Sequence, residues 1–158
     1  FSYKGFELNI FFQGSQGNDV FNGSRLFLES LQGGDNQLEV INDRWQQPGD
    51  ITNIPAATND PEQAASNVRV SSRFIEDGSY LRLKNLTLGY NFHIGDRLKN
   101  SISGFRVYFT GQNLFTLTKY SGLDPEVNYR GNDNAVIGTD FFTFPQARIY
   151  SFGLNLTF

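Results

Sequence analysis

The chain has 158 residues, with 16 Phe, 7 Tyr, 16 Gly and no Cys, and its formal net charge is -3. The absence of Cys excludes disulfides, Cys-ligated metals and thiol catalysis, and the lack of a Lys or Arg run argues against a nucleic-acid partner. No stretch approaches the ~18 consecutive apolar residues of a spanning helix, but a spanning strand needs only ~9 to 11 alternating residues. The chain has no Met and begins inside a strand pattern, so we expect it to be a piece of a longer protein.

The first predicted strand covers residues 2–13. Every second residue from Phe6 to Phe12 is large and apolar, whereas polar residues such as Glu7 and Asn9 lie between them. Alternation with a period of two is typical of a strand whose two faces meet different surroundings.

A long polar segment, residues 14–73, follows this strand and predicts a loop that holds one or two short helices. The first helix would be capped by Ser24, would stop at Gly33–Gly34, and would carry the apolar residues Leu28 and Leu31. The second would follow a capping box of Asn36 and Glu39. Its apolar face would hold Leu38, Ile41 and Trp45.

The second and third predicted strands, residues 79–92 and 105–117, are joined by a short polar turn, residues 93–104. Within the second strand the apolar residues change from one parity to the other. A β-bulge produces such a change, so we expect one near Lys84 and Asn85.

A second long polar segment, residues 119–145, leads to the last predicted strand, residues 146–158. Its apolar residues occupy alternate positions from Tyr150 to Phe158. No helix or second sheet of matching size is predicted elsewhere in the chain, so lipid is the expected cover for this row. Connections that alternate between short turns and long loops are typical of an antiparallel transmembrane β-barrel.

We therefore predict an all-β chain that supplies about four strands of such a barrel. The short turn and the C-terminus would face the periplasm, and the long loops would lie outside the cell. Polar residues on the other face of the strands are expected to point into the lumen: Arg82, Lys84, Arg106, Gln112 and Arg148.

Three stretches of the sequence resemble the C-terminal end of the SusC/RagA-type TonB-dependent outer-membrane transporters. They are RFIEDGSYLRLKNLTLGYNF (73–92), FRVYFTGQNLFTLTKYSGLDPEVN (105–128) and FPQARIYSFGLNLTF (144–158). Their DGSYLRLKN, GQNLF and KYSGLDPEV elements follow the order and spacing of the family. Residues 1–22 resemble the preceding strand and the start of its loop, whereas residues 23–70 carry no family motif.

The resemblance implies a barrel of roughly 22 strands with a plugged lumen, located in the outer membrane of a Gram-negative bacterium. It implies energy from the TonB complex, through an N-terminal plug that is absent from this chain. It also implies a SusD-like surface lipoprotein as partner, import of oligosaccharides or peptides, and no enzymatic activity. Three terminal residues resemble the signal read by the barrel assembly machinery: Gly153, Leu156 and Phe158.

Candidate sites for chemistry are few. His93 is the only histidine and lies in a predicted turn, with no Ser or acidic residue in a recognisable catalytic arrangement. Oxygen ligands for a bound Ca²⁺ occur close together in one loop, without EF-hand spacing, and Asx-turns explain them equally well. They are Asp124, Glu126 and Asn128, with Asp133 and Asp140 further on. We expect no other cofactor.

Aromatic residues in the long loops are candidates for contact with the imported solute: Trp45, Tyr120 and Tyr129. In the alternative interpretation, Trp45 packs against a loop helix, and Phe141, Phe142 and Phe144 belong to the outer aromatic rim of the barrel. A different class of protein also stays open. A soluble carbohydrate-binding β-sandwich would use the same loop aromatics but would need a second apolar layer. A small passive barrel or adhesin would need at least eight strands.

Overall fold

The computed structural model describes residues 1–32, 36–95, 102–131 and 133–158. It divides the chain into two compact units. The sheet unit comprises residues 1–16, 79–118 and 145–158, and the loop unit comprises residues 17–78 and 119–144. In the described part of the chain, no helix has the length and apolar character needed to cross a membrane.

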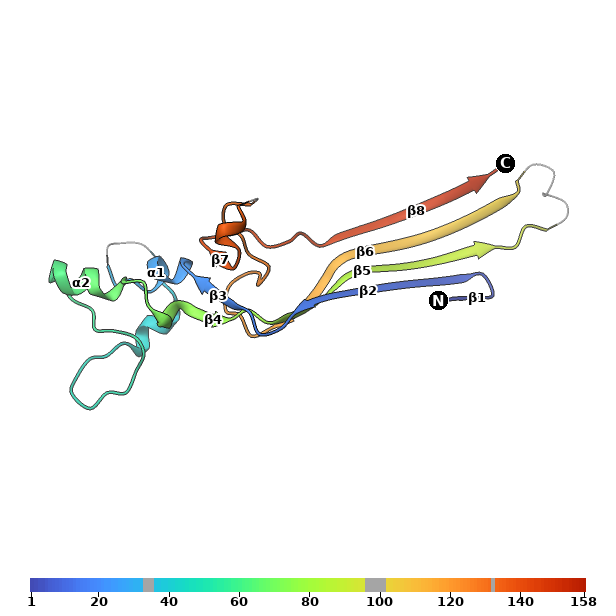
Figure 1. Ribbon diagram of the computed structural model, residues 1–158. Helices are drawn as coiled ribbons and strands as arrows, with labels where there is room; N and C mark the ends of the chain where they lie inside the picture. The colour runs from blue at the N-terminus through green and yellow to red at the C-terminus, as the bar shows by residue number, and fades with distance from the viewer. Residues whose placement is uncertain (33–35, 96–101, 132) are drawn as a thin grey trace. The chain divides into compact units, whose positions relative to one another are not determined.

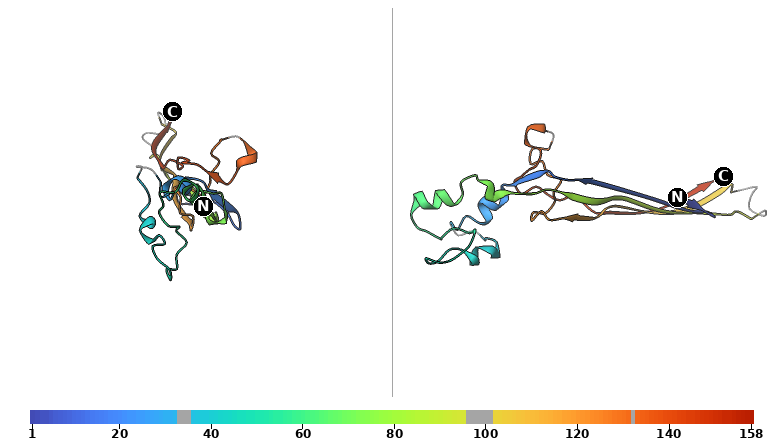
Figure 2. Two further views of the ribbon diagram at one scale, coloured as in Figure 1. Left: turned by 90° about the vertical axis from the view of Figure 1, so that its left-hand side faces the viewer. Right: turned by 60° about the horizontal axis from the view of Figure 1, so that its bottom comes forward.

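The sheet unit is a single antiparallel sheet of five strands in the order β1-β2-β5-β6-β8 (Figure 1). Both Figure 1 and the right-hand view of Figure 2 show the four long strands running side by side. The strands are β1 (Ser2–Tyr3), β2 (Phe6–Ser15), β5 (Tyr80–Phe92), β6 (Gly104–Thr118) and β8 (Ile149–Thr157).

The strand predicted over residues 2–13 is two strands joined by a tight turn, so that prediction was wrong at its start. Tyr3 pairs with Phe6, which leaves Lys4 and Gly5 as a two-residue hairpin loop. Both turn residues have positive φ, 45° for Lys4 and 89° for Gly5. Two-residue turns of this kind match the right-handed twist of the flanking strands, so the Lys-Gly pair is the local cause of the hairpin.

The register places one kind of residue on each face of the sheet. Phe6 lies opposite Tyr90, Tyr90 opposite Val107, and Val107 opposite Leu154. The neighbouring row on the other face runs from Glu7 through Gly89 and Tyr108 to Gly153. Directly opposed residues in a sheet share a face, so the sheet has one apolar face and one polar face.

Two bulges interrupt this register, of which one was predicted. Lys84 is the extra residue on β5, since Leu83 pairs with Phe12 and Asn85 with Phe11, and this confirms the bulge expected from the change of parity. On β6, Asn113 and Leu114 stand against Lys84 alone. Asn113 has a φ of 51°, a conformation that Asn tolerates better than most residues.

The predicted end of the sheet also needs correction. The last strand was expected over residues 146–158, but β8 begins at Ile149, which pairs with Gln112. Regular pairing stops there because β6 bulges at the next residue. The Asn113 side chain continues the link, since its Nδ2 donates to the carbonyl oxygen of Ala147 at 3.0 Å.

The two ends of the sheet differ in their connections. The Lys4–Gly5 turn, the end of β5, the start of β6 and the end of β8 gather at one end, where Phe92 pairs with Phe105 and Gly104 with Thr157. Residues 96–101 of the predicted turn lie outside the described residues. The long connections leave from the opposite end, where Tyr80 pairs with both Ser15 and Thr118.

The loop unit contains a three-stranded sheet that the sequence did not predict, in the order β4-β3-β7. Strand β3 pairs antiparallel with β4 and parallel with β7. The core of the loop unit contains Val20, Tyr120 and Val127, which are 0%, 5% and 4% exposed. The strands are β3 (Asp19–Asn22), β4 (Ile75–Asp77) and β7 (Thr139–Asp140).

Short helices lie in this unit, but their starts differ from the predicted ones. Helix α1 covers Ser24–Leu28, and its cap is Gly23 rather than Ser24. The Ser24 hydroxyl instead accepts a hydrogen bond from the backbone N–H of Phe142, at 2.7 Å. The helix also ends earlier than predicted, at Leu28 with Glu29 as its C-cap, so Leu31, whose φ is 57°, lies beyond it. Gly33 and Gly34 themselves lie outside the described residues.

The predicted capping box of Asn36 and Glu39 is wrong. The 3-10 helix η1 (Glu39–Asp43) is capped by Leu38 without any side-chain hydrogen bond, and it ends before Trp45. Two other 3-10 helices are η2 (Ser72–Phe74) and η3 (Asn134–Val136).

Helix α2 (Pro61–Asn67) has a signal that the sequence analysis missed. The Asp60 side chain accepts hydrogen bonds from the backbone N–H groups of Glu62 and Gln63, and Pro61 is the first helical residue. An Asp cap followed by Pro is a typical helix start.

Candidate functional site

Much of the apolar face of the sheet unit is exposed, although Leu83 in the middle of β5 is buried. On β8, Phe152 and Leu154 are 83% and 66% exposed, so no layer in the described part of the chain covers them. Soluble proteins rarely expose a continuous apolar row of this size. This exposure contradicts the β-sandwich alternative, which needs a second apolar layer, and favours a lipid-covered surface.

Aromatic rings line the end of this face where the short turns lie. The ring of Phe6 lies 4.5 Å from that of Tyr90, Tyr90 lies 4.7 Å from Phe92, and Phe92 stacks on Phe105 at 4.8 Å. An aromatic band at the edge of an apolar surface is typical of a barrel at a membrane interface.

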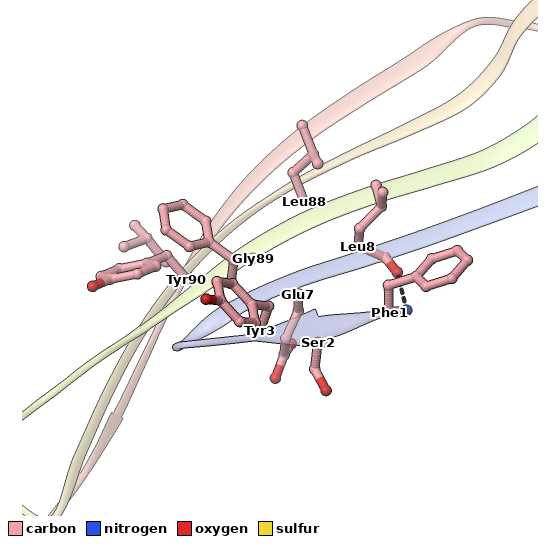
Figure 3. A pocket seen from close by; sticks show the side chains of 10 residues that line it. Phe1, Ser2, Tyr3, Glu7, Leu8, Leu88, Gly89 and Tyr90 are labelled. Atoms are coloured by element: carbon pink, nitrogen blue, oxygen red, sulfur yellow. Dashed lines mark hydrogen bonds between the residues drawn. The ribbon is translucent and has the colours of Figure 1, made fainter.

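A shallow groove on the apolar face lies between β1, β2 and β5 (Figure 3). Figure 3 shows Leu8 and Leu88 on one side of the sheet and Ser2 and Glu7 on the other. The groove measures about 380 Å³ and is lined mainly by apolar residues.

The polar face holds a charged cluster between neighbouring strands. Glu7 accepts hydrogen bonds from Asn91 Nδ2 at 2.7 Å and from Arg106 Nη2, also at 2.7 Å. A Cβ atom on Gly89 would lie 3.2 Å from both Arg106 and Glu7, so the absence of a side chain there makes room for the ion pair. Arg106 and Gln112 share this face, as predicted for lumen residues.

Arg82 also lies on the polar face, since it pairs with Gln13 and Thr116. It is only 1% exposed, and its Nε donates to Thr116 Oγ1 at 2.9 Å. The two remaining residues predicted to face the lumen are placed differently. Lys84 occupies the bulge. Arg148 is exposed and precedes β8.

The terminal residues predicted as an assembly signal lie on β8 or just after it. The ring of Tyr108 covers Gly153 so closely that a Cβ atom at Gly153 would lie 2.2 Å from a ring carbon. Leu156 and Phe158 are 52% and 85% exposed. In the described part of the chain, β8 pairs with β6 alone, so its other edge keeps unpaired backbone groups.

In the loop unit, an ion-pair network joins α1, η2 and β4. Glu29, whose side chain is 2% exposed, binds Arg25 Nε at 2.6 Å and Arg73 Nη2 at 2.7 Å. Arg25 also binds Glu76 at 3.0 Å. Both guanidinium groups lie over the ring of Phe74, which is 1% exposed.

Opposing effects set the pKa of two groups in this network. Burial alone would raise the pKa of Glu76, but hydrogen bonds from Ser121, Arg25 and Asn22 outweigh it and hold the pKa below its usual value. Burial would likewise lower the pKa of Arg25, but its bonds to Glu29 and Glu76 raise it. Both groups are therefore charged at neutral pH.

Tyr120 is a core residue, which corrects its prediction as a solute contact. Its side chain is 5% exposed, and its hydroxyl donates to Asp140 Oδ2 at 2.6 Å. Burial, followed by this bond to a carboxylate, raises the pKa of Tyr120. A ligand cannot reach the ring in this structure.

Tyr129 lies in an aromatic cluster of the loop unit and is 37% exposed. Its ring lies 5.2 Å from that of Phe141, which in turn contacts Phe21 and Phe27. Phe142 contacts Phe27 at 5.8 Å. Phe141 and Phe142 therefore pack within the loop unit, which contradicts the alternative that placed them on the barrel rim, whereas Phe144 is 91% exposed.

Trp45 lines an open groove of about 410 Å³ in the loop unit. It is 39% exposed, and its backbone N–H donates to the carbonyl of Ile54 at 3.0 Å. Side chains of Asn67 and Arg73 also line the groove. The groove therefore brings an aromatic residue together with residues that carry amide and guanidinium groups.

The predicted calcium ligands form turns. Asp124 Oδ1 accepts from the backbone N–H of Glu126 at 2.9 Å, and Asn128 Oδ1 accepts from that of Arg130 at 3.2 Å. Across the residues that the structure describes, no three His, Asp or Glu side chains come together as a metal site would require. Calcium binding stays a prediction. His93 is exposed, just beyond β5.

Sequence reasoning missed most of the polar residues of the loop unit. Arg73 and Glu76 come from a different segment than Arg25 and Glu29, and no local spacing in the sequence predicts the contacts between the two segments. A signal did exist for Arg25 and Glu29, which stand at the i, i+4 spacing of a helical ion pair.

Known proteins resemble the chain along almost its entire length, although no protein-family model matches it. TonB-dependent receptor P3 of Formosa agariphila is 38% identical over 160 residues, which are 99% of this chain and 15% of the receptor. TonB-dependent receptor SusC of Bacteroides thetaiotaomicron is 40% identical over 90 residues, 56% of this chain and 8% of SusC.

A solved structure of the RagAB peptide transporter has the same fold over this region. It superposes with a TM-score of 0.78 and 31% identity, and covers 99% of this chain and 16% of the matched chain. The present chain thus spans about 15% of the length of receptor P3. These relatives are receptors and transporters, not enzymes. The chain belongs to the SusC/RagA-type TonB-dependent receptors and forms part of their antiparallel β-barrel, which it does not close by itself.

Proposed function

We propose that this chain supplies wall strands and two outer loops to a TonB-dependent importer of oligosaccharides or peptides. The similarity to receptor P3 along 99% of the chain carries the proposal. The RagAB relative is a peptide transporter, which supports import as the activity. The rest of the barrel, and the plug that engages TonB, belong to the longer protein.

The sheet unit suits a barrel wall in the Gram-negative outer membrane. Its four long strands, of 9 to 15 residues, are long enough to cross the membrane when tilted. The apolar face would meet lipid, and the face with Glu7 and Arg106 would meet the lumen. The end with the short turns and the C-terminus would be periplasmic, because barrels of this class have short periplasmic turns.

The loop unit suits the outer side, where a SusD-like lipoprotein would cover the barrel. Within it, the Trp45 groove is the proposed contact for the solute, since an aromatic ring beside amide and guanidinium groups binds both sugar rings and peptides. Tyr129 is a second candidate, at the edge of the aromatic cluster. Gly153, Leu156 and Phe158 would be read by the assembly machinery at the open edge of β8.

Uptake by cells tests this proposal. Cells with and without the gene for the full-length protein would receive radiolabelled oligosaccharides or a labelled peptide digest, each with and without functional TonB. We expect uptake of one class only when both the protein and TonB are present. Uptake that is unaffected by loss of the gene, for both classes, would refute the proposal.

Trp45→Ala tests the groove in the same cells. The substitution should reduce uptake at limiting solute by roughly tenfold, the usual effect of losing about 1.4 kcal/mol of binding free energy. Ile51→Ala is the matched control, because Ile51 is fully exposed in the same loop. Equal uptake by the Trp45→Ala and Ile51→Ala variants would show that Trp45 does not contact the solute.

A further inference from the structure

The Trp45 groove of the loop unit is held in shape by hydrogen bonds between its walls. The backbone N–H of Trp45 donates to the carbonyl of Ile54 at 3.0 Å, and Asn67 Nδ2 donates to the carbonyl of Ala56 at 3.0 Å. Ile54 is 5% exposed, so the wall between these two bonds is anchored in the unit. The volume of about 410 Å³ falls within the range of about 300 to 1,000 Å³ that ligand sites span.

One guanidinium group of the groove, that of Arg73, has its charge compensated. Its Nη2 binds Glu29 at 2.7 Å, and its Nη1 donates to the carbonyl of Asn67 at 3.4 Å. The network behind it holds two arginines and two carboxylates, because Arg25 binds both Glu29 and Glu76. Arg73 therefore leaves little positive charge for a ligand.

The second guanidinium group, that of Arg69, is not compensated. Arg69 is exposed, and its guanidinium makes no ion pair or hydrogen bond with any residue in the described part of the chain. No Asp or Glu occurs among the described residues that line the groove. The backbone N–H of Arg69 donates to the carbonyl of Ser66 at 3.3 Å, which holds the residue just after the end of α2. The groove therefore carries a positive charge that is open to a ligand.

Two neutral side chains add further hydrogen-bonding groups to the groove. Asn53 and Ser71 both line it and are both exposed. Neither side chain is hydrogen-bonded to another residue that the structure describes, and the Ser71 hydroxyl does not cap η2. A guanidinium, an amide and a hydroxyl are all able to donate to an anionic oxygen. The free polar groups of the groove thus suit an anion.

Trp45 restricts the ligand further. It is 39% exposed, so its side chain is open to the apolar face of a sugar ring or to the aliphatic part of a peptide side chain. A neutral ligand would use this ring and leave the Arg69 guanidinium in water. A ligand with a carboxylate would use both groups, because a guanidinium matches the planar geometry of a carboxylate. Uronic acids carry a carboxylate in oligosaccharides, and acidic side chains carry one in peptides.

We propose that the Trp45 groove is a subsite for a carboxylate-bearing residue of the imported solute. The carboxylate would accept hydrogen bonds from Arg69, with Asn53 and Ser71 as further donors. The apolar part of the same residue would lie against Trp45. The inference rests on the proposed function, an importer in the outer membrane, and selects acidic solutes from its two solute classes.

Binding to the full-length transporter, purified with its lipoprotein partner, tests the subsite. The peptide probes are two fluorescent pentapeptides with amidated C-termini, Gly-Gly-Glu-Gly-Gly and Gly-Gly-Gln-Gly-Gly. The oligosaccharide probes are fluorescent trigalacturonic acid and its neutral methyl ester. In one pair, the acidic probe should bind about fivefold more tightly than the neutral probe, because an ion pair that is open to water has a modest effect. The pair that shows this preference identifies the source of the carboxylate.

Two variants connect this preference to Arg69. Arg69→Gln removes the charge, and because the guanidinium has no partner in the described structure, folding should be unaffected. This variant should bind the acidic and the neutral probe with equal affinity. Lys119→Gln is the matched control, because Lys119 is also exposed in the loop unit and does not line the groove. The control should keep the fivefold preference.

Failure of the subsite is distinguishable from failure of the proposed function. If cells take up either class but no acidic probe binds more tightly than its neutral counterpart, the importer stands and the subsite is overturned. The subsite is also overturned if Arg69→Gln keeps the preference or if Lys119→Gln loses it. A loss of lipoprotein from the purified Arg69→Gln complex, with the preference intact, would reassign the groove to the partner. Uptake of neither class would refute the importer itself.

Discussion

Replacing Glu29 by Gln should loosen the loop unit more than any other change of a single charge there. Gln has nearly the same size, but it puts an NH₂ group where a carboxylate oxygen accepts from a guanidinium. The Glu29 carboxylate is 2% exposed and binds Arg25 at 2.6 Å and Arg73 at 2.7 Å. Removing the charge therefore leaves one arginine facing an NH₂ donor and the other facing a neutral carbonyl oxygen.

The magnitude follows from the burial of the partners. Breaking a fully buried ion pair on one side costs about 3 to 5 kcal/mol. The arginine side chains are 19% and 18% exposed, and water can partly solvate them after the change. We therefore expect a loss near the lower limit, about 3 kcal/mol.

Hydrogen exchange of the full-length protein, followed by mass spectrometry, measures this loss. About 3 kcal/mol corresponds to exchange on the order of a hundredfold faster in the loop unit. The informative amides are those of Phe21 and Gly23, which donate to Gly138 and Asp140, each at 2.8 Å. Glu39→Gln, at an exposed position of the same unit, is the control. If the amide exchange rates of the two variants agree within a factor of three, the reasoning is refuted.

Three further predictions concern the two units. The Cβ atom added by Gly153→Ala would clash with the ring of Tyr108 and should lower the stability of the barrel by about 1 to 3 kcal/mol. The temperature at which heating shifts the band on a gel should therefore fall. A second substitution in the same chain, Tyr108→Ala, should restore that temperature. Leu154→Arg, on the apolar face, should cost about 2 to 4 kcal/mol in lipid, whereas Ser151→Arg on the polar face should be tolerated, and equal effects would reject the assignment of faces. Since the pKa of Glu76 is lowered, its contribution to stability is present above the ordinary carboxyl pKa and is lost as the pH falls through the folded value. The protection lost by Glu76→Gln, corrected for intrinsic exchange rates, should therefore shrink on acidification; a constant difference would contradict this.

The strands were predictable because period-two alternation is a local property of the sequence. The bulge at Lys84 could be seen because one extra residue reverses the parity of the apolar row. The bulge on β6 could not, since Asn113 and Leu114 together leave the parity unchanged. The Lys4–Gly5 turn was missed because alternation on both sides of it was read as one strand.

The loop unit was the least predictable part because its partners are distant in the sequence. Asn22 binds Ser121 across 99 positions, and Ser24 accepts from Phe142 across 118. Tyr120 looked like an exposed loop aromatic, but its hydroxyl is satisfied only by Asp140 in a strand that the sequence did not indicate. Helix α2 is different, since the Asp60-Pro61 pair at its start is a local sequence signal from which the helix could have been predicted.

The parallel pairing of β3 with β7 has a consequence for exchanging loops between relatives. Residues 17–78 and 119–144 form one compact unit, in which Phe21 pairs with Thr139 and Asn22 with Asp140. A chimaera that receives only the first segment would keep a β7 with no matching neighbour. Solute preference should therefore transfer between such proteins only when both segments are transplanted together, as though they were a single inserted domain.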